Sequence, residues 1–390
     1  MNQRFIIAPI VIFFIYIFSL SSLAFSVSQK VIDKEDNKEE QQQNLEHQTK
    51  ETYCLAKVIK IISDIEEELP GGNKQRTQQL LIKILDGPEK NKERATTNVI
   101  PDNPAFAIIG EAGKKYLVAK IEDLSTGIED YYVSDYYREP VIWFLSLIFI
   151  GVILVVGGFK GVRSLVSLII TIALIAFVLI PSIVKGVNPL LMAIIISFFS
   201  TALTMMLVAG INVKSLASTL GTVIGITFSG ILATLVIQCA PLTGLASTEA
   251  MILWGNQIYN INFKGLLACG MIVSCLGAIM DVAISVASSI QEIELANPSY
   301  KIKELFSSGM NIGKDIMGTM INTLVLAYTG MGLPLLILIS HEKNPSKFLN
   351  LELVVSEFAA AIAGSIGLIL SIPITALIMS FLVYKKPYLK

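Results

Sequence analysis

Apolar stretches about as long as a bilayer is thick recur along the chain. The first covers residues 5–25, and a long polar region follows it. Seven more come after that region, at residues 141–158, 165–184, 189–209, 216–238, 265–290, 317–340 and 358–384. A helix needs about 20 mainly apolar residues to cross the hydrocarbon core of a membrane. The pattern therefore predicts an α-helical polytopic membrane protein with about eight transmembrane helices.

The polar region between the first and second predicted helices divides into two parts. Residues 26–52 are rich in Gln, Glu, Lys and Asn and are typical of a disordered tether. Short runs of strand character follow, separated by turn signals such as Pro70-Gly-Gly and Asp86-Gly-Pro. These runs are residues 53–62, 78–85, 94–99, 116–121 and 131–137. We expect a small exported β-rich domain, OB-like in size, at residues 53–139 and a seven-helix membrane domain at 140–390.

The first apolar stretch has two interpretations. A short basic start at Arg4 and the ending Ser-Ser-Leu-Ala-Phe-Ser are compatible with a cleaved signal peptide. The alternative is an uncleaved first helix or signal anchor over residues 1–25. Both interpretations place the polar region that follows on the far side of the membrane.

Composition excludes several classes of protein. Of the 390 residues, 53% are hydrophobic and 16% are charged, which is typical of a membrane protein and not of a soluble domain. The net charge of −1 and the lack of a basic cluster argue against nucleic acid as a partner. Four cysteines without paired spacing and two histidines give no pattern for a metal site or a cofactor.

Basic residues in the short loops predict the orientation. If the β-rich domain is outside the cell, nine Lys and Arg residues fall on the cytoplasmic side: Lys160, Arg163, Lys214, Lys301, Lys303, Lys314, Lys385, Lys386 and Lys390. The outer short loops carry four, which are Lys185, Lys264, Lys343 and Lys347. The positive-inside rule then predicts that both termini are cytoplasmic and that residues 26–139 are extracellular.

A carboxylate lies inside the apolar stretch at residues 265–290. Asp281 is close to the middle of this predicted helix, where a charge is costly unless something compensates it. Ser285, Ser288 and Glu292 follow at helical steps of four, three and four, and so share one face with Asp281. An ionisable residue at this depth is a candidate for a functional site.

The next predicted helix carries a second polar stripe. Asp315, Thr319, Asn322 and Thr323 recur at helical spacing, and a short loop makes the two helices antiparallel neighbours. We expect Thr319 and Asn322 to supply hydrogen bonds near Asp281. The two stripes would then form a proton or ion relay, and the alternative is a hydrogen-bonded contact that only packs the helices.

Three acidic residues are secondary candidates. Asp315 and Glu292 are expected near the cytoplasmic interface, where Asp315 favours the N-terminal end of its helix. Glu357 lies near the outer end of the last predicted helix. It is either part of an outer gate or an ordinary interfacial charge.

Several motifs resemble a known family. Gly277-Ala-Ile-Met-Asp-Val-Ala-Ile-Ser and Gly318-Thr-Met-Ile-Asn-Thr-Leu-Val-Leu-Ala-Tyr are similar to runs in the YibE/F family of bacterial membrane proteins, as are Asn297-Pro-Ser and Gly364-Ser-Ile-Gly-Leu. The resemblance implies an integral protein of the bacterial cell membrane, often suspected to be a transporter. A weaker, local similarity links Asp281 and the Thr/Asn-bearing helix to the proton-relay helix pair of resistance-nodulation-division exporters.

The leading hypothesis is a transporter or exporter component, coupled to ions or protons through Asp281. A second hypothesis is a non-transporting scaffold or partner subunit whose exported domain binds a surface ligand or protein. A third, an intramembrane protease using Asp281 and Asp315, is disfavoured because helical rise separates them by roughly 13 to 16 Å. We therefore expect no enzyme, with the lipid bilayer and a second copy or second membrane subunit as partners.

Overall fold

The computed structural model describes residues 49–68, 74–123, 127–255, 261–341 and 345–384. The predicted first helix and most of the predicted tether lie outside these ranges. The chain divides into two compact units that meet between Val152 and Ile153. Each unit has a hydrophobic core of its own.

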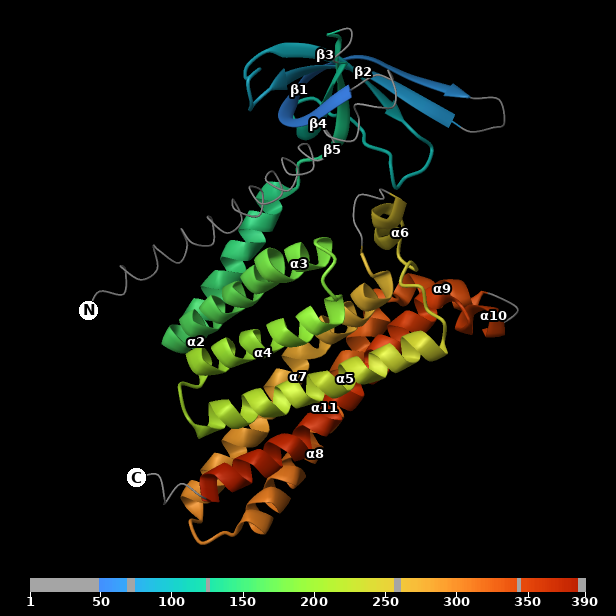
Figure 1. Cartoon of the computed structure of the whole chain (residues 1–390). Coiled ribbons are helices and arrows are strands. Elements are labelled where there is room, and N and C mark those ends of the chain that lie inside the picture. Colours follow the sequence, from blue (N-terminus) through green and yellow to red (C-terminus); the bar gives the residue numbers. More distant parts are fainter. Residues whose placement is uncertain (1–48, 69–73, 124–126, 256–260, 342–344, 385–390) are drawn as a thin grey trace, which may run out of the picture. The chain divides into compact units, whose positions relative to one another are not determined.

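The N-terminal unit contains one antiparallel five-stranded sheet (Figure 1). Its strands are β1 Thr49–Glu68, β2 Lys74–Ile84, β3 Glu93–Ile100, β4 Lys115–Asp123 and β5 Glu129–Tyr136. Each coincides with one of the five strands expected from the sequence, although β1 is about twice as long as expected. The order is β3-β2-β1-β4-β5, so the first strand lies in the middle.

Apolar side chains that alternate with polar ones along the strands form the hydrophobic core of this unit. Val58, Leu80, Ile82 and Val118 point inward and are almost completely buried, as expected when one face of a sheet is apolar. The two outer strands also approach each other, because the Thr96 hydroxyl on β3 donates a hydrogen bond to the Tyr131 carbonyl on β5. The sheet therefore curls into a half-barrel.

An ionic cluster forms on this unit around Glu89. Its carboxylate accepts a 2.7 Å hydrogen bond from the Tyr131 hydroxyl and lies 3.1 Å from Arg94 and 3.7 Å from Lys120. The Tyr131 hydrogen bond and these cations lower the pKa of Glu89 to about 2. Burial and the same hydrogen bond raise the pKa of Tyr131 to about 12.

The second unit begins within a long helical run formed by α2 Glu139–Leu174, the π-helical turn η2 Ile175–Leu179 and α3 Ile180–Val184. The run is broken at Gly158, whose φ of 51° and ψ of −131° are non-helical. A Cβ atom at Gly161 would lie 2.4 Å from the Ile153 carbonyl oxygen, which shows how sharply the chain turns.

The remaining helices are α4 Pro189–Val208, α5 Val213–Cys239, α6 Thr248–Gly255, α7 Phe263–Ala296, α8 Ile302–Met331, α9 Leu333–Ser340, α10 Pro345–Leu349 and α11 Glu352–Tyr384 (Figure 1). Three of these helices begin at an asparagine N-cap. The side chains of Asn188, Asn212 and Asn262 accept hydrogen bonds from backbone amides in the first turns of α4, α5 and α7.

Five helices in the described ranges are long and apolar enough to cross a membrane, and the bent pair α8 and α9 would make six. The run from Glu139 to Val184 counts once, although its 46 residues would span about 69 Å if straight. That length is about twice the hydrocarbon thickness, so it accommodates the two spans predicted on either side of Gly158. The first predicted span, residues 5–25, lies outside the described residues.

Helices α5, α7 and α11 form the centre of the bundle. Glycines bring α5 and α11 into backbone contact: a Cβ at Gly225 would lie 2.7 Å from the Gly367 carbonyl oxygen, and one at Gly367 2.8 Å from the Gly225 carbonyl oxygen. Further along, Gly221 faces Thr375, so the two helices are antiparallel. Small residues allow such close approach in membrane bundles.

Candidate functional site

Asp281 lies in the middle of α7 on its exposed face. The neighbouring positions Val282 and Ala283 are fully buried in the bundle, whereas Asp281 is exposed in the single chain. Within the described ranges, no hydrogen bond or ion pair reaches the Asp281 carboxylate. The helix itself supplies only a backbone contact, because the Ser285 hydroxyl donates to the Asp281 carbonyl at 2.7 Å.

The expected hydrogen bonds from α8 to Asp281 are not formed. The Thr319 hydroxyl donates to the Ile316 carbonyl at 2.9 Å, and the Thr323 hydroxyl donates to the Thr319 carbonyl at 3.0 Å. Thr319, Asn322 and Thr323 are exposed in the single chain, because the adjacent Met317, Met320 and Ile321 pack against the core instead.

The two helices are nevertheless antiparallel neighbours, as the sequence predicts. Gly309 of α8 faces Ile290 of α7, and Gly313 faces Val286. Continuing this register places Asp281 level with residues 318 and 319. From the limits of the two predicted spans, helical rise predicts Asn322 close to the level of Ser285. The register instead places Asn322 opposite Gly277, about 6 Å from the level of Asp281 on the side away from Ser285.

The same register corrects one estimate. Asp315 lies about 5 Å from the level of Asp281 along the axis, not 13 to 16 Å as estimated from the sequence. The estimate from the sequence assumed that the predicted spans, residues 265–290 and 317–340, are centred at the same depth. The observed register between α7 and α8 differs from that assumption. Both carboxylates are exposed, and no interaction between them is formed in the described part of the chain.

The other predicted residues are spread along these faces. Ser288 is half-buried on α7 and Glu292 is exposed near the end of that helix. The space beside Asp281 is open on both helices, because a Cβ at Gly277 or at Gly318 would meet no atom within 4 Å. The stripe is thus a polar, open surface of the bundle and not a closed site.

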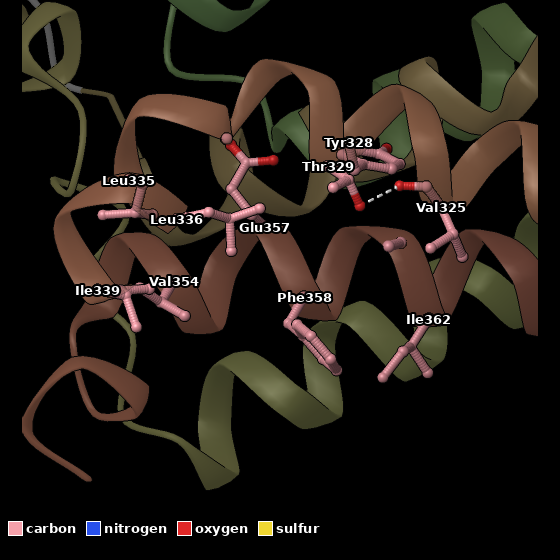
Figure 2. A pocket seen from close by; sticks show the side chains of 12 residues that line it. Val325, Tyr328, Thr329, Leu335, Leu336, Ile339, Val354, Glu357, Phe358 and Ile362 are labelled. Atoms are coloured by element: carbon pink, nitrogen blue, oxygen red, sulfur yellow. Dashed lines mark hydrogen bonds between the residues drawn. The ribbon is translucent and has the colours of Figure 1, made fainter. Parts of the chain in front are cut away.

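Glu357 occupies a cavity that the sequence did not reveal. A cavity of about 230 Å³ lies between α8, α9 and α11, with Glu357 in its wall (Figure 2). Leu335, Leu336 and Phe358 are among its apolar lining residues. Figure 2 shows the Glu357 side chain between Leu335 and Leu336 of α9 and Tyr328 and Thr329 of α8.

A second cavity adjoins the first. It measures about 400 Å³ and is lined by α7, α8, α11 and residues 244–250, with Tyr328 and Glu357 again in its wall. Ser274, Ser247 and Ser356 make this cavity more polar than the first. A hydrogen bond joins the Ser274 hydroxyl to the Tyr328 hydroxyl at its edge.

Glu357 and Asp281 are separate sites. Because Gly364 faces Cys275 and Gly367 faces Ile279, α7 and α11 are parallel. This register places Glu357 near the level of Ala268, thirteen residues and about 20 Å from Asp281 along the axis. Ser274 lies between them, two turns from Asp281 on the same face.

Sequence reasoning missed Ser274 and Tyr328. Ser274 carries a usable signal, since it precedes Asp281 by seven residues and therefore shares its helix face. Tyr328 carries none, because a tyrosine near the end of an apolar stretch is usual at a membrane interface. Over the described ranges, no group of three or more His, Cys, Asp or Glu side chains is placed to hold a metal ion.

Comparison with known proteins gives one finding. Neither a curated protein nor a solved structure matches the chain. A family model described as YibE/F-like protein matches residues 145–385, which cover most of the helical bundle and include α7, α8 and α11. The chain therefore belongs to the YibE/F family.

Proposed function

We propose that this protein is a transporter or exporter component of the bacterial cell membrane, coupled to the movement of protons or cations through Asp281. The observation that carries the proposal is the Asp281 carboxylate, which lies in the middle of a 34-residue helix and has no partner among the residues that the structure describes. Lipid does not solvate such a group, and ionisable residues in these positions mark ion and proton pathways.

The hydroxyls around Asp281 suit a hydrated path. Ser285, Thr319 and Thr323 donate to backbone carbonyls of their own helices. Each hydroxyl oxygen keeps its lone pairs and can accept a hydrogen bond from water or contact a cation. Together with the open space at Gly277 and Gly318, these oxygens provide acceptors along the two faces where a positively charged species would move.

The orientation belongs to the same proposal. Both termini are cytoplasmic and the β-rich domain is extracellular. The helix directions support the expected alternation of successive spans. Helices α7 and α11 are parallel to each other, and α5 and α8 are antiparallel to them. The exposed polar faces of α7 and α8 favour a second copy or a second membrane subunit against this side of the bundle.

Reconstitution tests the proposal. The purified chain is inserted into liposomes that hold a pH-sensitive dye, and candidate ions and solutes are added outside. We expect flux with the natural protein and with the control Glu249→Gln, an exposed carboxylate of α6 outside both polar faces. We expect loss of flux with Asp281→Asn at equal insertion and unchanged thermal stability. Normal flux through Asp281→Asn would exclude coupling at this residue.

The second candidate function is binding by the exported domain in a scaffold or partner subunit. The strand order β3-β2-β1-β4-β5, with β3 linked to β5 through Thr96, supports an OB-like barrel, a fold that often binds extended ligands. Removal of residues 53–137 separates the two functions. A transporter whose pathway lies in the helices retains flux without this domain, whereas a scaffold loses its binding activity.

A further inference from the structure

The two cavities beside Glu357 share a wall that joins an apolar space to a polar one. Tyr328 and Glu357 line both. On one side Leu335, Leu336 and Ile339 of α9 form a hydrocarbon surface. On the other side the serines at 247, 274 and 356 supply polar groups.

The apolar cavity results from a break in the chain. Helix α8 ends at Met331, α9 begins at Leu333, and their axes differ by 69°. Pro334 follows Gly332 at this point and favours the start of a new helix, since proline is accepted in the first turn. The bend carries α9 away from the direction of α8 and leaves the cavity between these helices and α11. Broken helices surround the binding sites of many transporters.

The charged side chain that lines the two cavities is acidic. In the part of the chain that the structure describes, no Lys, Arg or His lines either space, and the Glu357 carboxylate has no hydrogen bond or ion pair. The Tyr328 hydroxyl is bonded to Ser274, and the Thr329 hydroxyl donates to the Val325 carbonyl at 2.7 Å. A half-buried carboxylate in such surroundings favours a positively charged partner.

We propose that the cavity between α8, α9 and α11 binds a small organic cation, with its charged nitrogen at Glu357 and its hydrocarbon part against Leu335, Leu336 and Phe358. An inorganic cation needs several oxygen ligands, which the hydrocarbon wall does not supply. An alkylammonium group needs one negative charge and an apolar surface, and both are present. The site is distinct from Asp281, and its occupation does not depend on the proposed coupling there.

Equilibrium dialysis of the full chain in detergent micelles tests the proposal, with labelled tetrapropylammonium as the probe and empty micelles as the blank. The charge-reversed control probe is tetrapropylborate, which carries the same four propyl groups on a negatively charged centre. We expect saturable binding of the cation, and weaker binding of the anion by at least about tenfold, or about 1.4 kcal/mol.

Two variants locate the site. Glu357→Gln should weaken tetrapropylammonium binding at least about tenfold, and Ala361→Phe should abolish it by filling the cavity that Ala361 lines. The matched control is Glu249→Gln, which removes a carboxylate from an exposed position of α6 outside both linings and should leave binding unchanged.

Equal binding of cation and anion by the natural protein would overturn the proposal, as would full binding by Ala361→Phe. These outcomes remain decisive if Glu357→Gln fails to fold, which gel filtration detects. Because dialysis measures occupation and not flux, a failure here is distinguishable from a failure of coupling through Asp281.

Discussion

The contact between Gly225 and Gly367 provides a quantitative test of the bundle. Replacing Gly367 with Ala adds a methyl carbon 2.8 Å from the Gly225 carbonyl oxygen and 2.8 Å from Ser229 Cβ. An unstrained contact needs a separation of roughly 3.5 Å, so α5 and α11 must move apart by about 0.7 Å. The obstructing atom belongs to the backbone and has no rotamer to change. Overpacking of this kind typically costs about 1–3 kcal/mol.

Thermal unfolding of the detergent-solubilised protein, followed by size-exclusion fluorescence, measures this cost. For a bundle of this size, about 1 kcal/mol corresponds to roughly 2–4 °C, so Gly367→Ala should lower the midpoint by roughly 2–12 °C. The control is Gly277→Ala on α7, where the added methyl meets no atom within 4 Å. That variant should unfold at the natural temperature or slightly above it. A Gly367→Ala midpoint equal to that of the control would refute the helix contact.

Two further predictions concern the exported unit and an interhelical connection. The pKa of Glu89 falls from its ordinary value of 4.5 to about 2 on folding, so its stabilisation is complete above pH 4.5 and is lost as the pH falls through 2. Glu89→Gln in a fragment of residues 49–138 should therefore lower the free energy of unfolding by about 1–3 kcal/mol at pH 7. Urea unfolding of this variant should also show a smaller fall in that free energy as the pH is lowered. An unchanged acid profile would contradict this. The Glu352 carboxylate accepts hydrogen bonds from the Thr243 and Gly244 amides at 2.6 and 2.7 Å. Glu352→Ala should speed hydrogen exchange of these two amides at least about tenfold, and unchanged exchange would exclude this connection.

The sequence was sufficient for the elements whose patterns are local. Short runs of strand character, separated by turn signals such as Pro70-Gly-Gly and Asp86-Gly-Pro, predict all five strands. The length of the apolar stretches predicts α4, α5, α7 and α11, and predicts α8 and α9 as a single span. The break after Met331 was not predicted, since Gly332 and Pro334 continue an apolar run and their effect on direction depends on packing.

The candidate site was predictable only in part. The spacing of Asp281 and Ser285 along one helix follows from helical rise alone. The depth of Asn322 does not, because it depends on the register between α7 and α8. Which way the stripe on α8 faces does not, because it depends on whether Met317 and Met320 or Thr319 and Asn322 pack against the core. The methionines do, so the polar side chains face outward. The cavity at Glu357 requires three helices from distant parts of the chain and has no local signature.

Accessibility of position 281 to water tests the central claim most directly. In a chain whose native cysteines are replaced by Ser, cysteine is introduced by Asp281→Cys and, as controls, by Val282→Cys and Phe228→Cys. Val282 is fully buried, and Phe228 is exposed on the apolar surface of α5. A membrane-impermeant, positively charged thiol reagent is then applied to the protein in liposomes. The account predicts modification at position 281 and none at positions 282 and 228. No modification at position 281 in the correctly folded protein would show that lipid or protein seals this face, and would contradict an ion path at Asp281.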